Sequence, residues 1–250
     1  SAALAIYLRE RIPDLEYVFC DTKKELPETY EYLDRLEAYL GHPIVRLDNG
    51  GRDFDHHLTL RRGFLPSPQH RWCTEELKIK PLERYVGNDQ AVSYVGLRAD
   101  EDRQGHLSTK PNIVPVFPFK EDGITLHDVL RILEGSGLGL PQYYQWRSRS
   151  GCFFCFYQRK IEWVGLLKNH PELFEEARQY ERPDRGQGYT WCDNESLEEI
   201  AKPERVAQIK AEYAEHLAMS TEKQPNRRLC DLFSSFSKET IDEVMESWKP

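Results

Sequence analysis

The cysteines of this chain have a spacing that can hold a metal. Cys152 and Cys155 form a Cys-x-x-Cys pair with two phenylalanines between them, and Cys73 stands alone among basic residues earlier in the chain. Such a pair can also carry thioredoxin-like redox chemistry or pack as two apolar residues. A structural zinc site usually shows two close ligand pairs, whereas one close pair with distant single cysteines is more typical of an iron–sulfur cluster. We therefore expect a metal centre, with a cluster favoured over zinc.

A fourth ligand for this centre has two candidates. Cys192 lies in a polar segment before an expected helix, and Cys230 follows an arginine and a leucine. We favour Cys192, and a centre with only three cysteines is a further option. Cys20 stands within an apolar run and is expected to be a core residue.

Polar side chains follow the expected strands at the points where ligands bind in open parallel sheets. Asp21 comes directly after an apolar run, and it could hold a ribose hydroxyl or a metal, or only cap the next segment. A second polar cluster spans residues 48–53 and a third spans residues 96–103. In the third, Arg98 and Arg103 could grip phosphates, or form surface ion pairs with the acidic residues between them.

The apolar pattern predicts the elements that position these residues. In the first half, short apolar runs of buried-strand type alternate with helical patterns, and this order predicts an α/β fold with a doubly wound, mostly parallel sheet. We expect strands at residues 17–20, 44–47, 91–96 and 113–116, and helices at residues 1–12, 28–40 and 74–85. The stretch 49–72 is polar and punctuated by glycine and proline, and we expect a loop long enough to be functional.

The strand pattern stops near residue 124, and helical patterns follow. We expect helices at residues 126–133, 161–181, 197–217 and 238–248, with a glycine-rich turn at 135–139. The chain is therefore expected to divide into an α/β domain over residues 1–123 and a C-terminal helical appendage over residues 124–250, which carries the Cys-x-x-Cys pair.

The composition fits an ordinary soluble protein. The 250 residues carry a net charge of −8, and no apolar run approaches the roughly 20 residues of a membrane helix. Six cysteines without a secretory signal favour a reducing, cytoplasmic location. The negative charge argues against binding nucleic acid by bulk charge. Basic residues nevertheless gather near the two cysteine segments, at Arg61, Arg62, His70, Arg71, Arg147, Arg149, Arg159 and Lys160.

Taken together, these segments resemble the phosphoadenosine phosphosulfate (PAPS) reductase-like branch of the adenine nucleotide α-hydrolases, which have a HUP-like α/β fold. That branch carries a Ser-Gly-Gly-x-Asp-Ser phosphate loop. Ser1 is similar to its last residue, with the rest of the loop absent through truncation or disorder; alone, Ser1 could equally be a helix N-cap. Phe19-Cys20-Asp21-Thr22 with Pro27-Glu28-Thr29-Tyr30 is similar to the second-strand element beside the adenosine.

Two further segments are similar to motifs of this branch. Cys73 followed by Lys78 is similar to the start of the reductases' Cys-Cys-x-x-Arg-Lys-x-x-Pro-Leu cluster motif, with Thr74 in place of the second cysteine. The run from Gly96 to Glu101 is similar to a Gly-Ile-Arg-x-x-Glu element, and the later Cys-x-x-Cys to the downstream cluster pair.

The resemblance implies ATP, Mg²⁺ and a 4Fe–4S cluster as cofactors. It implies nucleotide binding by Ser1, Asp21, Thr22, Gly96 and Arg98. It implies neutralisation of a leaving pyrophosphate by Arg98, Arg103 and Lys78. It implies cluster ligation by Cys73, Cys152 and Cys155, with Cys192 as the favoured fourth ligand.

Within this branch, sulfonucleotide reductases end in a Cys-Gly-Leu-His nucleophile segment, whereas Cys230 is followed by Asp-Leu-Phe. The chain is instead similar to the ATP pyrophosphatase subunits of DNA phosphorothioation systems (Dnd or Ssp type). This implies the DNA backbone as substrate, a cysteine desulfurase as sulfur donor, other DNA-modification subunits as partners, no membrane partner, and a homodimer as one assembly. The alternatives are a sulfonucleotide reductase acting on PAPS or adenosine phosphosulfate, a tRNA-thiolating enzyme, and a non-enzymatic DNA-binding or assembly subunit.

Overall fold

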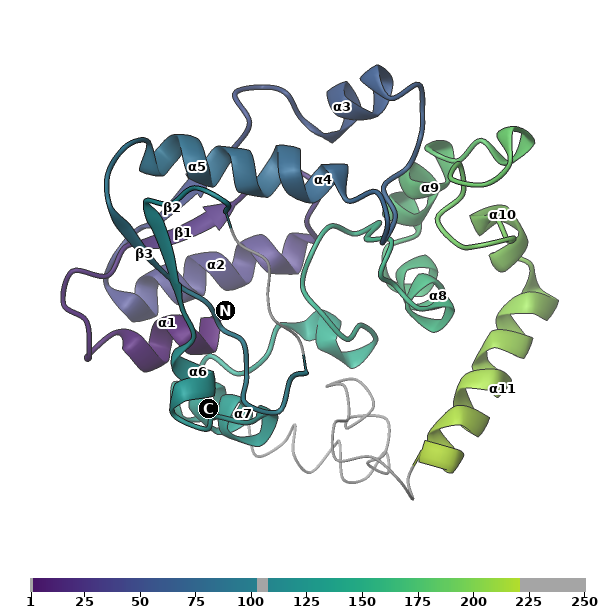
Figure 1. Cartoon of the computed structure of the whole chain (residues 1–250). Helices are drawn as coiled ribbons and strands as arrows, with labels where there is room; N and C mark the ends of the chain where they lie inside the picture. The colour runs from purple at the N-terminus through teal and green to yellow at the C-terminus, as the bar shows by residue number, and fades with distance from the viewer. Residues whose placement is uncertain (1, 103–107, 221–250) are drawn as a thin grey trace. The chain divides into compact units, whose positions relative to one another are not determined.

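The computed structural model describes residues 2–102 and 108–220, with side chains through residue 218. The chain divides into two compact units, which we treat one at a time (Figure 1). The described part of the first unit comprises residues 2–62, 68–102 and 108–141, and that of the second comprises residues 63–67 and 142–220. The boundary expected at residue 123 lies inside the first unit.

The first unit holds two small parallel sheets. β1 (Tyr17–Cys20) pairs with β2 (Ile44–Leu47), and β3 (Ala91–Tyr94) pairs with β4 (Ile113–Val116). Parallel neighbours need a crossover connection, which α2 (Pro27–Leu40) supplies for the first pair. The expected α/β class is confirmed, and the strands lie where expected except that the one expected at residues 91–96 ends at Tyr94. A doubly wound sheet is not confirmed, because the strands of the described residues form two separate pairs.

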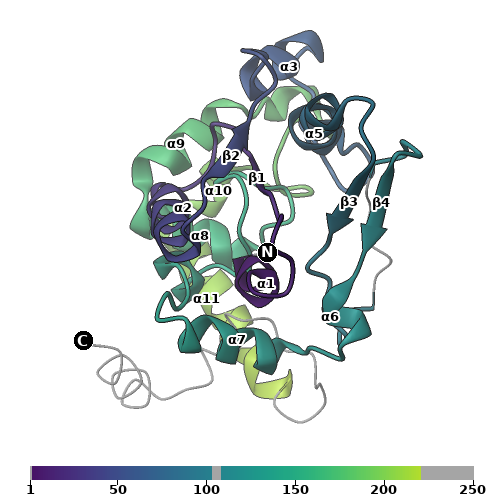
Figure 2. The same ribbon diagram turned by 90° about the vertical axis from the view of Figure 1, so that its left-hand side faces the viewer.

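α2 shows how local sequence sets these elements. Pro27 lies in the first turn, where a missing N–H costs no helical hydrogen bond, and Gly41 ends the helix in the left-handed region with a φ of 69°. Figure 2 shows α2 on one side of the β1–β2 pair and α5 (Lys80–Val86) on the other. The residues that pack α2 against the strands repeat at helical spacing and include Tyr32, Leu36 and Leu40.

The other helices of the first unit are α1 (Ala2–Leu8), α3 (Phe54–Leu60), α4 (Trp72–Thr74), α6 (Pro118–Glu121) and α7 (Leu126–Gly135), and a π-helical turn, η1 (Glu75–Ile79), joins α4 to α5. α1 ends before the expected residue 12, ahead of Pro13. α1 and α7 share one apolar core, which places α7 in the first unit; its buried members are Ala3, Leu4, Leu8, Phe119 and Leu133.

α3 corrects the expectation that residues 49–72 form a loop. Asp53 caps this helix, because its side chain accepts a hydrogen bond from the backbone N–H of His56 at 3.0 Å. Phe54, His57 and Leu58 then fall on one buried side of the helix. The glycines and prolines of this stretch therefore flank a short helix.

The second unit is helical and contains η2 (Gln142–Gln145), α8 (Lys160–Asn169), α9 (Pro171–Gln179), η3 (Pro183–Arg185), α10 (Leu197–Ile200) and α11 (Pro203–Ser220). The helices expected at 161–181 and 197–217 are both interrupted, at Pro171 and Pro203, because proline disfavours helical backbone in the residue before it. The helix expected at 238–248 lies outside the described residues. None of the described helices is both long and apolar enough to cross a membrane.

Candidate functional site

The carboxyl ends of β1 and β2 lie side by side. The N–H of Asp21 donates to the carbonyl oxygen of Leu47 at 2.7 Å, which extends the parallel ladder by one residue. Asp21 is therefore a neighbour of Asp48 and Asn49, which follow β2. Two of the three predicted polar clusters thus meet at one strand edge, where α/β sheets bind ligands.

Asp21 is a buried, ionised carboxylate at this edge. Its side chain accepts hydrogen bonds from Lys23 Nζ at 2.7 Å, from the Lys23 backbone N–H at 2.9 Å and from the Tyr30 hydroxyl at 2.8 Å. Burial alone would raise the pKa of Asp21, but these donors together hold it below its usual range. Burial and the nearby Asp21 charge raise the pKa of Tyr30, so its hydroxyl remains a donor.

The turn after β1 is strained. Lys23 has a φ of 59°, a left-handed conformation that costs a residue with a Cβ about 1–2 kcal/mol. Its two hydrogen bonds to Asp21 offset this cost. Backbone outliers of this kind concentrate at functional sites. Thr22 is fully buried and donates to Glu25 Oε1 at 2.9 Å, so it anchors the turn.

The third polar cluster, after β3, contains an arginine that is paired with two acidic residues. Arg98 Nε lies 2.9 Å from an oxygen of Asp100, and its Nη1 lies 3.2 Å from Glu101. The structure therefore shows Arg98 in ion pairs with the acidic residues that follow it. Gly96 lies two residues beyond β3. Two further residues that the sequence predicted to bind the nucleotide or its phosphates, Arg103 and Ser1, lie outside the described residues.

Lys78, expected to be catalytic, lies in the π-helical turn η1. Its carbonyl oxygen accepts a hydrogen bond from the Cys20 thiol at 3.4 Å, which ties η1 to the end of β1. Burial raises the pKa of the Cys20 thiol, in keeping with the core role expected for it. π-Helical turns are rare and often mark functional sites.

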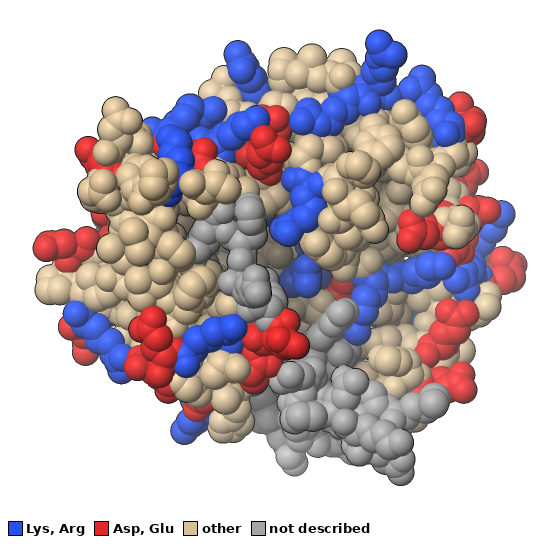
Figure 3. Space-filling model, in the orientation of Figure 1, with Lys and Arg blue, Asp and Glu red and all other residues tan. Residues whose placement is uncertain are grey.

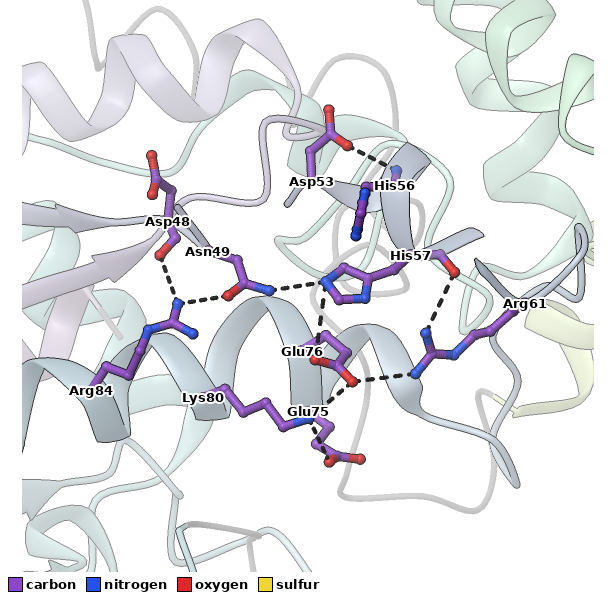
Figure 4. A network of polar contacts seen from close by, with 10 residues as sticks. All are labelled: Asp48, Asn49, Asp53, His56, His57, Arg61, Glu75, Glu76, Lys80 and Arg84. Atoms are coloured by element: carbon purple, nitrogen blue, oxygen red, sulfur yellow. Dashed lines mark hydrogen bonds and ion pairs between the residues drawn. The ribbon is translucent and has the colours of Figure 1, made fainter. Parts of the chain in front are cut away.

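A polar network that the sequence did not reveal surrounds His57, beside the end of β2 (Figure 4). Asn49 Nδ2 lies 2.9 Å from His57 Nε2, and Arg84 donates to Asn49 Oδ1 at 2.6 Å. Glu76 Oε2 lies 4.0 Å from the same His57 nitrogen. Glu76 Oε1 in turn accepts from Lys80 at 2.9 Å. The network thus links the end of β2 to α3, η1 and α5.

The network has a defined protonation state. Burial lowers the pKa of His57 below its ordinary value, although Glu76 acts in the opposite direction. Burial alone would raise the pKa of Glu76, but Lys80, His57 and Arg61 together hold it below its usual range. At neutral pH the network therefore pairs a neutral imidazole with an ionised carboxylate.

The surrounding surface is mixed in charge. Figure 3 shows Lys and Arg side chains over the part of this face where α3 and α5 lie in Figure 1, with acidic side chains among them. Arg61 illustrates the mixture, because its guanidinium lies 3.3 Å from Glu76 and 4.7 Å above the Trp72 ring. Trp72 in turn stacks on Phe54 at 5.1 Å.

A sequence signal for His57 did exist, since the Asp53 cap and the i, i+3, i+4 apolar spacing that follows predict a short helix.

The predicted metal ligands fall in different units. Cys73 lies in α4 of the first unit, whereas Cys152, Cys155 and Cys192 lie in the second. Burial raises the pKa of the Cys192 thiol to about 12. Among residues 2–102 and 108–220, no three His, Cys, Asp or Glu side chains are gathered so as to hold a metal ion. Cys230 lies outside the described residues.

Comparison with known proteins bears on the first unit. Residues 1–116 match the phosphoadenosine phosphosulfate reductase domain family. The match supports the PAPS reductase-like superfamily. It implies the α/β, HUP-like fold, and PAPS reductase family members are enzymes that act on nucleotides. The matched region contains Asp21, Arg98 and the His57 network.

Curated relatives of this chain are named only as uncharacterized proteins. Two are proteins of Methanocaldococcus jannaschii, 26% identical over 74% of this chain and 23% identical over 70%. The chain spans only 41% and 43% of their lengths. A third is a protein of Escherichia phage 186, 26% identical over 66% of each chain. These relatives extend the likeness beyond the matched domain.

Proposed function

We propose that this protein is an ATP pyrophosphatase that adenylates a poorly reactive phosphate oxygen of the DNA backbone in preparation for sulfur insertion. The observation that carries the nucleotide part is the buried, ionised Asp21 at the shared carboxyl edge of β1 and β2, inside a region that matches a nucleotide-acting family. The proposed DNA substrate rests on the resemblance to phosphorothioation subunits.

In the first step, the acceptor oxygen attacks the α-phosphorus of ATP, and the bond to the bridging oxygen of the β-phosphate breaks. Pyrophosphate leaves with its electrons, so the task of the site is to neutralise negative charge. Arg98 and Lys78 are the described cations for this task. Because Arg98 is paired with Asp100 and Glu101, phosphate binding requires that it exchange one of these carboxylates.

In the second step, the outer sulfur of a persulfide from a cysteine desulfurase partner attacks the activated phosphorus, and AMP leaves. A second thiol then attacks the inner sulfur of the S–S bond, which forms a disulfide and leaves the phosphorothioate on the DNA. Cys73, Cys152 and Cys155, with Cys192 as the favoured fourth ligand, would hold the iron–sulfur cluster that the resemblance implies, and we assign no step to it. Mg²⁺ bound to the ATP phosphates would supply further charge neutralisation. We give it no protein ligand, since the oxygens of Asp21 are already held by Lys23 and Tyr30.

The proposal is tested by measuring pyrophosphate release from ATP by the full encoded protein, with DNA, with tRNA and without either. We expect release that DNA stimulates, and a loss of at least about tenfold in Asp21→Asn, because the variant loses a charged acceptor for a ribose hydroxyl of ATP. Asp34→Asn is the matched control, because Asp34 is an exposed aspartate of the same unit. No release under any condition would refute the proposal, and stimulation by tRNA alone would point to RNA thiolation.

A sulfonucleotide reductase is the second candidate, and the matched PAPS reductase domain favours it. Such an enzyme would bind PAPS or adenosine phosphosulfate and release sulfite when thioredoxin is present. Sulfite release without pyrophosphate release would select this alternative over the first.

A further inference from the structure

The Cys-x-x-Cys segment of the second unit lies in a stretch without acidic residues. The chain has 42 Asp and Glu among 250 residues, so a random stretch of the 20 residues 142–161 would hold about three. It holds none, and it contains four basic residues, Arg147, Arg149, Arg159 and Lys160. In a chain of net charge −8, this is a local positive segment.

Buried side chains fix the backbone of this segment. Arg147 is fully buried and donates to the carbonyl oxygens of Gly151 at 3.1 Å and Cys152 at 2.6 Å. Gln158 donates to the carbonyl oxygen of Phe153 at 2.8 Å. Phe154 is 2% exposed and stacks on Trp191. These contacts hold the backbone of the turn.

Three neighbouring side chains form a surface that we call the Arg149–Tyr157 surface: Arg149, Phe156 and Tyr157. The Arg149 guanidinium lies 4.9 Å from the centre of the Tyr157 ring, and the Phe156 ring lies 4.5 Å from that ring. Tyr157 is 38% exposed, and Arg149 is also exposed. Within the part of the chain that the structure describes, Arg149 has no carboxylate partner.

The other basic residues of the segment differ from Arg149. Lys160 is paired with Glu195, and Arg159 lies 3.6 Å from the buried Glu162. Arg147 is used internally, as described above. Among the four basic residues of this segment, Arg149 is thus the one whose charge is available to bind an external anion.

We propose that the Arg149–Tyr157 surface binds single-stranded DNA, with an unpaired base stacked on the rings and guanidinium and a backbone phosphate paired with Arg149. Aromatic rings and guanidinium planes stack on the faces of unpaired bases. In a duplex these faces are covered by the neighbouring base pairs, so the surface favours a single strand. The choice of DNA rests on the proposed function. The surface would hold an unpaired stretch of the substrate strand.

The test is fluorescence anisotropy with the full encoded protein and a labelled DNA strand of about 20 nucleotides, longer than typical single-strand sites. We expect Tyr157→Leu to weaken binding about tenfold, because it removes the stacking ring, and Tyr157→Phe to bind nearly as well as the wild type. We expect Arg149→Gln to weaken binding and to reduce the salt slope of log K by about 0.7, the contribution of one phosphate contact on a single strand.

A matched control exists in the same unit. Arg185 lies 5.7 Å from the Tyr189 ring in a second Arg–Tyr pair outside the acid-free segment, and Arg185→Gln should leave binding unchanged. Circular dichroism checks that each variant is folded. Equal binding by wild type and a folded Tyr157→Leu variant would overturn the proposal, as would tighter binding of a duplex or of RNA of the same sequence.

Failure of this proposal and failure of the proposed function give different results. If the protein binds single-stranded DNA through Tyr157 but releases no pyrophosphate, the proposed surface stands and the ATP chemistry is refuted. If the wild type releases pyrophosphate but binds DNA no more tightly than the Tyr157→Leu variant does, the ATP chemistry stands and the proposed surface is refuted.

Discussion

Asn49 determines which ring nitrogen of His57 carries the proton. The side-chain amide of Asn49 accepts a hydrogen bond from Arg84 at its oxygen, 2.6 Å away, and its nitrogen lies 2.9 Å from His57 Nε2. Because Arg84 can only donate, the amide oxygen must face it, and the NH₂ group must face the imidazole. His57 Nε2 is therefore an acceptor, and the ring proton of the neutral imidazole lies on Nδ1.

This arrangement predicts the titration of His57. Burial lowers its pKa below the ordinary value of 6.5, with Glu76 opposing and Arg61 adding to the shift. Nitrogen-15 NMR of the ring should show the Nδ1-protonated tautomer at neutral pH and a titration below the ordinary value. Because the unfolded state binds this proton first, His57 should make the folded state less stable as the pH falls below about 6.5. A ring that titrates above its ordinary value would contradict the assignment.

Removing the Glu76 charge should lower the pKa of His57 further. Glu76 is the neighbour that favours the charged imidazole, so Glu76→Gln leaves burial and Arg61 unopposed. The control is Glu75→Gln, because Glu75 pairs with Lys80 and is mostly exposed. NMR titration of both variants decides the point. A rise in the pKa of His57 in Glu76→Gln, or equal shifts in the two variants, would show that Glu76 is not its electrostatic partner.

Asp21 should contribute stability that acid removes. Asp21→Asn keeps the shape but loses the charged hydrogen bonds to Lys23 and Tyr30, and we expect a loss of about 1–3 kcal/mol at neutral pH in urea unfolding. Since the folded pKa lies below the ordinary 3.8, this contribution is complete above 3.8 and disappears as the pH falls through the folded pKa. A difference between wild type and variant that grows in acid would contradict this sign. Asp34→Asn should change stability little.

Two glycines of one loop should respond differently to alanine. A Cβ on Gly188 would lie 2.3 Å from the Phe64 ring, whereas a Cβ on Gly186 would meet open space. Both have a positive φ, of 87° and 81°, so the backbone cost is shared. Gly188→Ala should therefore lose about 1–3 kcal/mol more than Gly186→Ala, the cost of overpacking. Urea unfolding followed by tryptophan fluorescence measures both, and equal losses would mean that Phe64 moves aside freely.

The sequence predicted those elements whose signals are local. β1 and β2 are short apolar runs with polar residues directly after them, and α2 lies between Pro27 and Gly41. α3 was missed because it spans only Phe54–Leu60, and the surrounding glycines and prolines outweighed the Asp53 cap. Pro171 and Pro203, where the later helices divide, are also local signals of a helix boundary.

The His57 network could not be predicted in the same way. Its members come from the end of β2, from α3, from η1 and from α5, and only the folded chain brings Asn49, His57 and Glu76 together. The cysteines show the same limit. Their residue type indicates thiolate chemistry, but sequence spacing does not determine whether Cys73 and the cysteines of the second unit share a centre.

The most direct test of the central claim is product analysis of ATP turned over by the full encoded protein with DNA present. Cleavage between the α- and β-phosphates predicts AMP, free or joined to DNA, together with pyrophosphate, and both products should fall in Asp21→Asn. The appearance of ADP and inorganic phosphate instead, or product formation that is unchanged in Asp21→Asn, would contradict the account.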